Sequence, residues 1–229
     1  MVEILERRET ETGWNMPTQI NSEDTVVFIG DSITDCDRKI DPLGLGHGFV
    51  RLFSDMLLIR EPEKHIQIIN RGISGQTVVE LFERWDADVL AHRPDWLNVL
   101  IGINDLHTWL HDKNNGVGPE QFLNFYRECL KKTRKELPNC QILLIDPFYI
   151  CLPATADEIQ SSVLNLLPEY QTVVSDMSYL FKTRVLRMHS IFVDLLQSQP
   201  GEKYAPEPVH PNATGHLAIA QAIYEKLWR

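Results

Sequence analysis

The chain carries few positive charges for its size. Lysine and arginine account for 22 of its 229 residues, against 32 aspartates and glutamates, which gives a formal net charge of −10 at pH 7. A protein that binds nucleic acid needs a basic surface to neutralise phosphates, and a protein that docks on anionic lipid needs one as well. The sequence therefore indicates neither a nucleic-acid partner nor a membrane partner.

Long apolar runs and paired cysteines are also missing. No apolar run approaches the ~18 residues of a membrane-spanning helix, and the first residues, MVEILERRETETGW, lack the apolar core of a signal peptide. The four cysteines, at 36, 129, 140 and 151, are not spaced as C-x-x-C pairs. We therefore expect reduced, structural thiols and no zinc site. These features favour a cytoplasmic protein, and a homo-oligomer is compatible with them.

Five short apolar runs rich in β-branched residues have the pattern of strands buried on both faces. They lie at 25–30, 65–70, 96–102, 141–146 and 190–195. Between and after them, apolar residues recur with the i, i+3, i+4 spacing of amphipathic helices. These helices are expected at 76–91, 119–136, 168–188 and about 213–228. The alternation predicts an α/β fold, a three-layer α/β/α sandwich around a five-stranded parallel sheet.

We expect one domain over residues 25–229, because no linker, repeat or low-complexity tract interrupts the pattern. The polar residues 1–24 are expected to form an irregular lead or a small strand pair. The last helix begins after Asn212, a residue type that caps helix N-termini well. A flavodoxin-like strand order fits the alternation, which does not by itself establish it.

Polar groups follow four of the five predicted strands at their carboxyl ends, where open parallel sheets bind ligands. Ser32 follows the first strand, the glycine-containing turn 70–77 the second, and Asn104 the third, while His210 lies in the long segment after the fifth. A serine hydroxyl needs a base within hydrogen-bond reach, and histidine suits that task. N–H donors stabilise the oxyanion of a tetrahedral intermediate. The set therefore favours acyl transfer.

Each of these features also has a structural interpretation. Asp-Ser is an ordinary turn or cap pair, and a histidine among prolines is often a rigid loop contact. Asn104 and Asp105 can cap the following segment, and Gly75 can simply allow the chain to turn between a strand and a helix. Their shared position at one edge of the sheet, in separate loops, favours the catalytic interpretation.

Four segments resemble blocks of the SGNH, or GDSL-type, hydrolases. FIGDSIT (28–34), NRGISGQT (70–77), IGIND (101–105) and EPVHPNATGH (207–216) resemble blocks I, II, III and V, in that order. The resemblance implies a flavodoxin-like three-layer fold and ester hydrolysis without metal or cofactor. A binder of flavin mononucleotide is not favoured, because no phosphate-binding loop rich in serine and threonine follows the first strand.

The resemblance also implies roles for individual residues. Ser32 is the expected nucleophile and offers a backbone N–H to the oxyanion hole. Gly75 is expected to give a second backbone N–H, and Asn104 gives a side-chain donor. His210 is the expected general base.

The family pattern implies structural roles for two other acids and departs at a third. Asp31 and Asp105 are expected to hold turns by hydrogen bonds. The family usually has aspartate three residues before the histidine, whereas this chain has Glu207, followed by Pro208. Glutamate serves as the acid in some catalytic triads, but its extra methylene requires it to fold back towards the imidazole. The alternative is that Glu207 points to solvent and a backbone carbonyl orients His210.

The substrate is expected to be a small-molecule or oligosaccharide ester. FIGDSITDC, PFYI at 147–150 and the VHP-x-x-x-GH ending look similar to bacterial carbohydrate acetylesterases of this family, such as acetylxylan esterases. Four aromatic residues could stack on a sugar ring or simply pack in the protein. These residues are Trp109, Phe148, Tyr149 and Tyr204.

Two alternatives stay open at this point. A general short-chain esterase, lysophospholipase or thioesterase would use the same site, and the segment HTWLHDKNNGVG at 107–118 could serve it as a flap. A catalytically silent binding module on the same fold is the other alternative, with Glu207 as a sign of decay.

Overall fold

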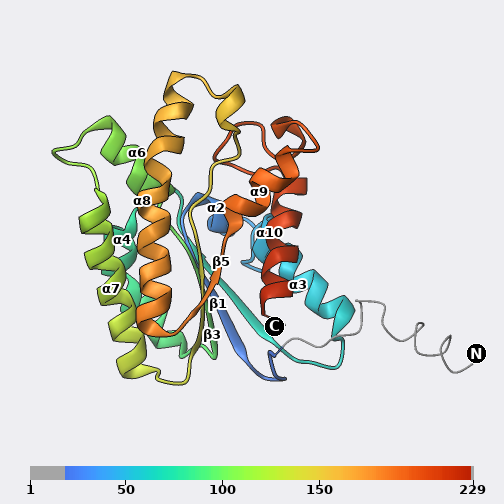
Figure 1. Cartoon of the computed structure of the whole chain (residues 1–229). Coiled ribbons are helices and arrows are strands. Elements are labelled where there is room, and N and C mark those ends of the chain that lie inside the picture. Colours follow the sequence, from blue (N-terminus) through green and yellow to red (C-terminus); the bar gives the residue numbers. More distant parts are fainter. Residues whose placement is uncertain (1–18, 228–229) are drawn as a thin grey trace, which may run out of the picture.

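The computed structural model describes residues 19–227 (Figure 1). Most of the predicted lead at 1–24 lies outside these residues, and 19–24 form a bend and a turn without a strand. No helix within residues 19–227 is both long and apolar enough to span a membrane.

The sheet has five parallel strands in the order β2-β1-β3-β4-β5. This is the flavodoxin-like order that the sequence pattern allowed. The strands are β1 (Thr25–Gly30), β2 (Gln67–Gly72), β3 (Trp96–Leu100), β4 (Gln141–Ile145) and β5 (Arg184–Leu186). The three central strands, β1, β3 and β4, are almost entirely buried, which explains their continuous apolar runs.

Helices cover both faces of the sheet (Figure 1). On one face α7 packs against α4 and α8, and on the other α10 packs against α3. The helices are α2 (Ser32–Asp35), α3 (Phe49–Arg60), α4 (Val78–Glu83), α5 (Trp85–Asp88), α6 (Ile103–His111), α7 (Pro119–Glu136), α8 (Glu158–Phe181), α9 (Met188–Leu196) and α10 (Ala213–Lys226). Three short 3₁₀ turns are η1 (Leu90–His92), η2 (Pro153–Thr155) and η3 (Gly201–Lys203).

The prediction of a strand at 190–195 is wrong. These residues belong to α9, which buries Met188, Phe192 and Leu196 at helical spacing. The fifth strand is Arg184–Leu186, at the edge of the sheet and only three residues long. A three-residue edge strand with two half-buried residues has no apolar run to reveal it, whereas residues 190–195 of α9 contain an apolar run that resembles a buried strand.

Several helix boundaries also differ from the prediction. The stretch 76–91 is divided into α4, α5 and η1, and the helix expected at 168–188 runs from 158 to 181. Its start is fixed by a capping box between Asp157 and Gln160, and it contains Pro168. The first five residues of the segment 107–118 end α6, and the Val117 N–H donates to the Thr108 hydroxyl at 3.3 Å. Its role as a flap stays a prediction.

Candidate active site

Three side chains from distant parts of the sequence form a continuous contact chain. The Ser32 Oγ lies 2.9 Å from the His210 Nε2, although the two residues are 178 positions apart. The His210 Nδ1 lies 2.5 Å from the Glu207 Oε1. The Glu207 and His210 side chains are about half exposed, with relative exposures of 47% and 55%, so the chain opens to solvent.

The end of β1 presents Ser32 at the rim of the sheet. A side chain on Gly30 would place its Cβ 2.1 Å from the Leu100 carbonyl oxygen, so only glycine fits beside β3. Asp31 then caps α2 by accepting a 3.0 Å hydrogen bond from the Ile33 N–H. Ser32 is therefore the first residue of a fixed helical turn, and its side chain is half-buried.

Glu207 folds back over the loop that carries His210. Its Oε2 accepts the Val209 N–H at 2.8 Å, and its Oε1 accepts the His210 N–H at 2.8 Å in addition to the imidazole. These bonds absorb the extra methylene of glutamate. The loop follows α9, and its carbonyl at Pro208 accepts the Ile150 N–H at 2.8 Å. The alternative in which Glu207 points to solvent is therefore wrong.

These contacts assign the imidazole protons. Partial burial raises the pKa of Glu207, but the hydrogen bonds from Val209 and His210 outweigh it and lower the pKa overall. An ionised carboxylate can only accept, so the His210 Nδ1 carries a proton. The Nε2 of a neutral imidazole is then left to accept the Ser32 hydroxyl proton.

The predicted oxyanion donors follow β1, β2 and β3: Ser32 begins α2, Gly75 lies in the loop before α4, and Asn104 lies in the first turn of α6. Gly75 is exposed at φ +80°, with no atom within 4 Å of where a Cβ would lie. The Asn104 Nδ2 donates to the Gln76 carbonyl at 3.0 Å, which orients the amide and leaves its second N–H available. The Ser74 N–H and hydroxyl both bond the Asp35 carboxylate, at 3.2 and 3.0 Å, and so join the Gly75 loop to α2.

Asp31 and Asp105 are buried and hold turns, as the resemblance implies. The Asp105 Oδ1 accepts the Val78 N–H at 2.9 Å and thereby fixes the first residue of α4, just after the Gly75 loop. Burial raises the pKa of Asp31 to about 7 and that of Asp105 to about 8. Within residues 19–227, neither carboxylate forms a hydrogen bond with Ser32 or His210.

Arg84, which the sequence did not single out, links the loops of the site. Its guanidinium donates to the carbonyls of Gly30 and Arg71 at 3.0 and 2.7 Å and to the Gln76 side chain at 2.5 Å. It thus braces the end of β1, the end of β2 and the residue whose carbonyl orients Asn104. An arginine inside an amphipathic helix pattern gives no sign that its side chain turns back to the strand ends.

His216 was also missed, although it lies in the matched segment 207–216. Its Nδ1 accepts the Phe49 N–H at 3.2 Å, and its Nε2 lies 3.6 Å from the Cys36 Sγ. Burial lowers the pKa of His216 to about 4, so the ring is neutral and can accept that bond. It therefore ties α10 to the start of α3 behind the catalytic loop.

The four aromatic candidates for substrate contact do not share one environment. Phe148 is 1% exposed and packs against Phe192 at a ring separation of 4.9 Å, so its prediction as a sugar contact is wrong. Tyr149 and Tyr204 are also buried. Trp109 is half-buried, with its ring close to Gly118. Of the four, only Trp109 keeps enough surface for stacking, and its role stays a prediction.

Within residues 19–227, histidine, cysteine and carboxylate side chains form no group of three or more that could hold a metal ion. The site instead offers a hydroxyl, an imidazole oriented by a carboxylate, and N–H donors on the adjoining loops. This combination can carry out nucleophilic attack on a carbonyl carbon.

Known proteins with similar sequences point to the same chemistry. Residues 28–218 match the model of the GDSL-like lipase/acylhydrolase family. An acetylxylan esterase from Geobacillus stearothermophilus is 31% identical over 218 residues, which cover 91% of this chain and 96% of the relative.

Solved structures agree with this match. A catalytic mutant of Axe2, an acetylxylan esterase from G. stearothermophilus, superposes with a TM-score of 0.82 at 30% identity, covering 91% of this chain and 96% of that one. Its structures include catalytic mutants in which a serine, an aspartate or a histidine is replaced by alanine. A GDSL-like lipase, so described for Parabacteroides merdae, superposes with a TM-score of 0.83 at 32% identity, covering 92% and 99% of the two chains. The chain belongs to the GDSL-like lipase/acylhydrolase, or SGNH, family of carboxylic ester hydrolases.

Proposed function

We propose that this esterase removes acetyl groups from acetylated xylo-oligosaccharides or closely related neutral glycans, through an acyl-enzyme formed on Ser32. The observation that carries the catalytic part is the contact chain from Ser32 through His210 to Glu207. The substrate class is supported by the acetylxylan esterase relative and by a solved structure of Axe2 described as an acetyl-xylooligosaccharide esterase.

The reaction begins when the His210 Nε2 accepts the hydroxyl proton of Ser32. The Ser32 Oγ attacks the ester carbonyl carbon, and the resulting oxyanion accepts hydrogen bonds from the N–H groups of Ser32 and Gly75 and from the Asn104 side chain. The imidazolium then protonates the leaving alkoxide as the C–O bond breaks. Water, deprotonated by His210, attacks the acyl-serine and releases acetate and the free serine.

Glu207 acts on the imidazole and not on the substrate. Its carboxylate holds the Nδ1 proton and stabilises the imidazolium that forms during each step. Since Glu207 makes the contact with the His210 Nδ1 that a triad acid needs, its replacement of the usual aspartate gives no reason to regard the site as a silent binding module.

Asn104→Ala should lower kcat for p-nitrophenyl acetate by about 10²- to 10³-fold, because one preorganised oxyanion donor is lost. KM should change little, since that hydrogen bond forms mainly in the transition state. Steady-state kinetics measure both constants. Asn115→Ala is a matched control, because Asn115 is an exposed residue whose amide bonds only Asp112. Unchanged kcat in Asn104→Ala would remove Asn104 from the oxyanion hole.

The substrate proposal predicts a preference for short acyl groups. In a series of p-nitrophenyl esters from acetate to decanoate, kcat/KM should be highest with acetate and should fall steadily with chain length. The reason is the relatives' acetyl chemistry: the acetylxylan esterase that is 31% identical to this chain is named for removing a two-carbon acyl group, whereas a long acyl chain needs an apolar groove. A maximum at octanoate or beyond would favour a lysophospholipase or thioesterase instead.

A further inference from the structure

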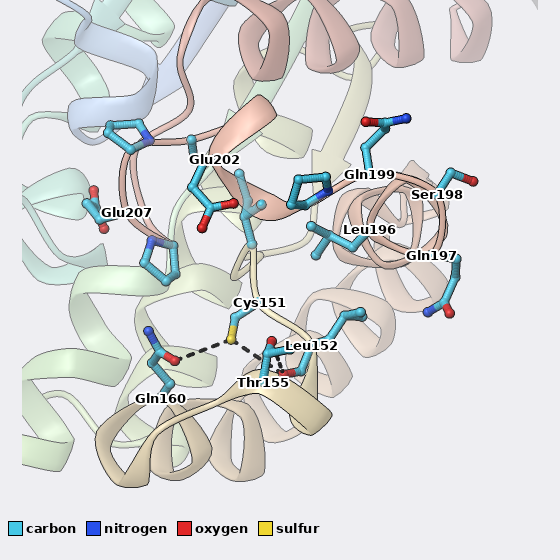
Figure 2. Close-up of a pocket in the computed structure, with 16 residues that line it drawn as sticks. Cys151, Leu152, Thr155, Gln160, Leu196, Gln197, Ser198, Gln199, Glu202 and Glu207 are labelled. Carbon is cyan, nitrogen blue, oxygen red and sulfur yellow. Dashed lines mark hydrogen bonds between the residues drawn. The ribbon is translucent and has the colours of Figure 1, made fainter.

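A cavity of about 550 Å³ adjoins the catalytic loop (Figure 2). Its wall is formed by three segments: 150–160, after β4; 196–202, at the end of α9; and 205–208, which includes Glu207. Figure 1 shows the last two as the orange to red segment beside the start of α8. The volume lies within the roughly 300–1,000 Å³ of typical ligand sites.

The wall is chemically suited to a neutral, hydroxyl-rich ligand. Amides and hydroxyls are supplied by Gln160, Gln197, Gln199, Ser198 and Thr155. The residues described as lining the cavity include the carboxylates of Glu202 and Glu207 but no lysine or arginine. Such a wall repels anionic ligands and offers both donors and acceptors to sugar hydroxyls.

Gln160 is fixed in a position to donate a hydrogen bond. Its Oε1 accepts the Asp157 N–H at 3.0 Å and contacts the Cys151 Sγ at 3.5 Å. The amide oxygen is therefore engaged, and the Nε2 points towards the side on which Glu207 lies (Figure 2). Glu202 extends into the cavity from η3 and supplies a carboxylate acceptor. A donor and an acceptor thus face the same space.

The chemistry of ester cleavage directs one part of the substrate towards this cavity. His210 must protonate the leaving alkoxide, so the alcohol part of the ester lies on the imidazole side of the tetrahedral centre. The predicted oxyanion donors instead lie just after the carboxyl ends of β1, β2 and β3. The loop that carries His210 also forms the cavity wall through Glu207 and Pro208, and the Ile150 N–H bonds it to the opposite segment.

We infer that this cavity binds sugar units on the alcohol side of the scissile ester, beyond the acetylated residue itself. The inference rests on the proposed function, because it assumes a glycan as the alcohol. It makes Gln160 and Glu202 determinants of oligosaccharide binding that act outside the reacting centre.

The test compares two substrates with the same acyl group. Acetylated xylotetraose is long enough to reach the cavity, whereas the leaving group of p-nitrophenyl acetate is not. Gln160→Glu keeps the acceptor oxygen of the α8 capping box and loses the donor, and Glu202→Ala removes the acceptor. Each variant should raise KM for the tetraose about three- to tenfold, the range for one lost hydrogen bond, and leave p-nitrophenyl acetate kinetics within about twofold.

The controls separate this inference from the proposed function. Glu169→Ala, an exposed glutamate of α8 outside the cavity wall, should leave both substrates unchanged. Wild-type KM values for the tetraose in both cavity variants would overturn the inference while leaving deacetylation in place. An equal loss on both substrates would also overturn it, because the side chains would then support the catalytic loop. Failure of the wild type to deacetylate any xylo-oligosaccharide would instead reject the proposed function.

Discussion

Ser32→Ala is expected to reduce kcat for p-nitrophenyl acetate by a factor on the order of 10⁶, because no acyl-enzyme can form without the hydroxyl. The fold should be retained. The hydroxyl makes one contact, with the His210 Nε2, whereas α2 is held by the Asp31 cap and by the Asp35–Ser74 bonds. Loss of a single partly exposed hydrogen bond costs about 1 kcal/mol of the free energy of unfolding.

The measurement combines kinetics with covalent labelling. A fluorophosphonate probe, followed by mass spectrometry, should modify the wild type at Ser32 and leave the variant unmodified. Ser162→Ala is the matched control, since Ser162 is an exposed serine on α8 that bonds only the Glu158 carbonyl. Substantial turnover by Ser32→Ala, or labelling at another serine in the wild type, would contradict the assignment of the nucleophile.

The fold could be predicted where burial shapes the sequence directly. Helices cover both faces of the strands β1, β3 and β4, so the sequence of each strand is an apolar run. β5 is different, because a three-residue edge strand is stabilised by its neighbour β4 and leaves no pattern of its own. α9 is short and contains the apolar run Ile191–Val193, so this part of its sequence matches a buried strand as well as a helix.

The same division applies to the active site. The pairing of Ser32 with His210 could be predicted because each residue lies in a recognisable segment near a strand end. The oxyanion roles of Gly75 and Asn104 stay predictions. Arg84 could not be predicted, since its importance depends on three acceptors that only the tertiary structure brings together. The burial of Phe148 and the contact between Glu207 and the His210 Nδ1 also depend on tertiary structure. They depend on how the segment after β4 packs against the segment after α9, which the sequence pattern does not specify.

Glu207→Gln should lower kcat by about 10²- to 10⁴-fold. The upper limit is the loss of about 10⁴ seen when the acid of a catalytic triad becomes an amide. A smaller loss is included because Glu207 is about half exposed, so solvent screens its charge. The structure gives a specific reason. The carboxylate accepts three N–H groups, two on Oε1 and one on Oε2. An amide has one acceptor oxygen, so its NH₂ group must face either the Val209 N–H or the His210 donors. In the second orientation the Nδ1 must accept, and the Nε2 then carries the proton and cannot activate Ser32.

Two further variants test whether the loss of activity comes from removing the carboxylate at position 207. Glu207→Asp keeps the charge but is one methylene shorter, so it should retain more activity than Glu207→Gln. Glu169→Gln makes the same chemical change at an exposed site of α8 and should have no effect. The comparison uses kcat for p-nitrophenyl acetate and the rate of fluorophosphonate labelling, which both depend on serine activation. If Glu207→Gln kept the wild-type labelling rate, the carboxylate would not set the imidazole tautomer, and the Ser32–His210 pair would work without it.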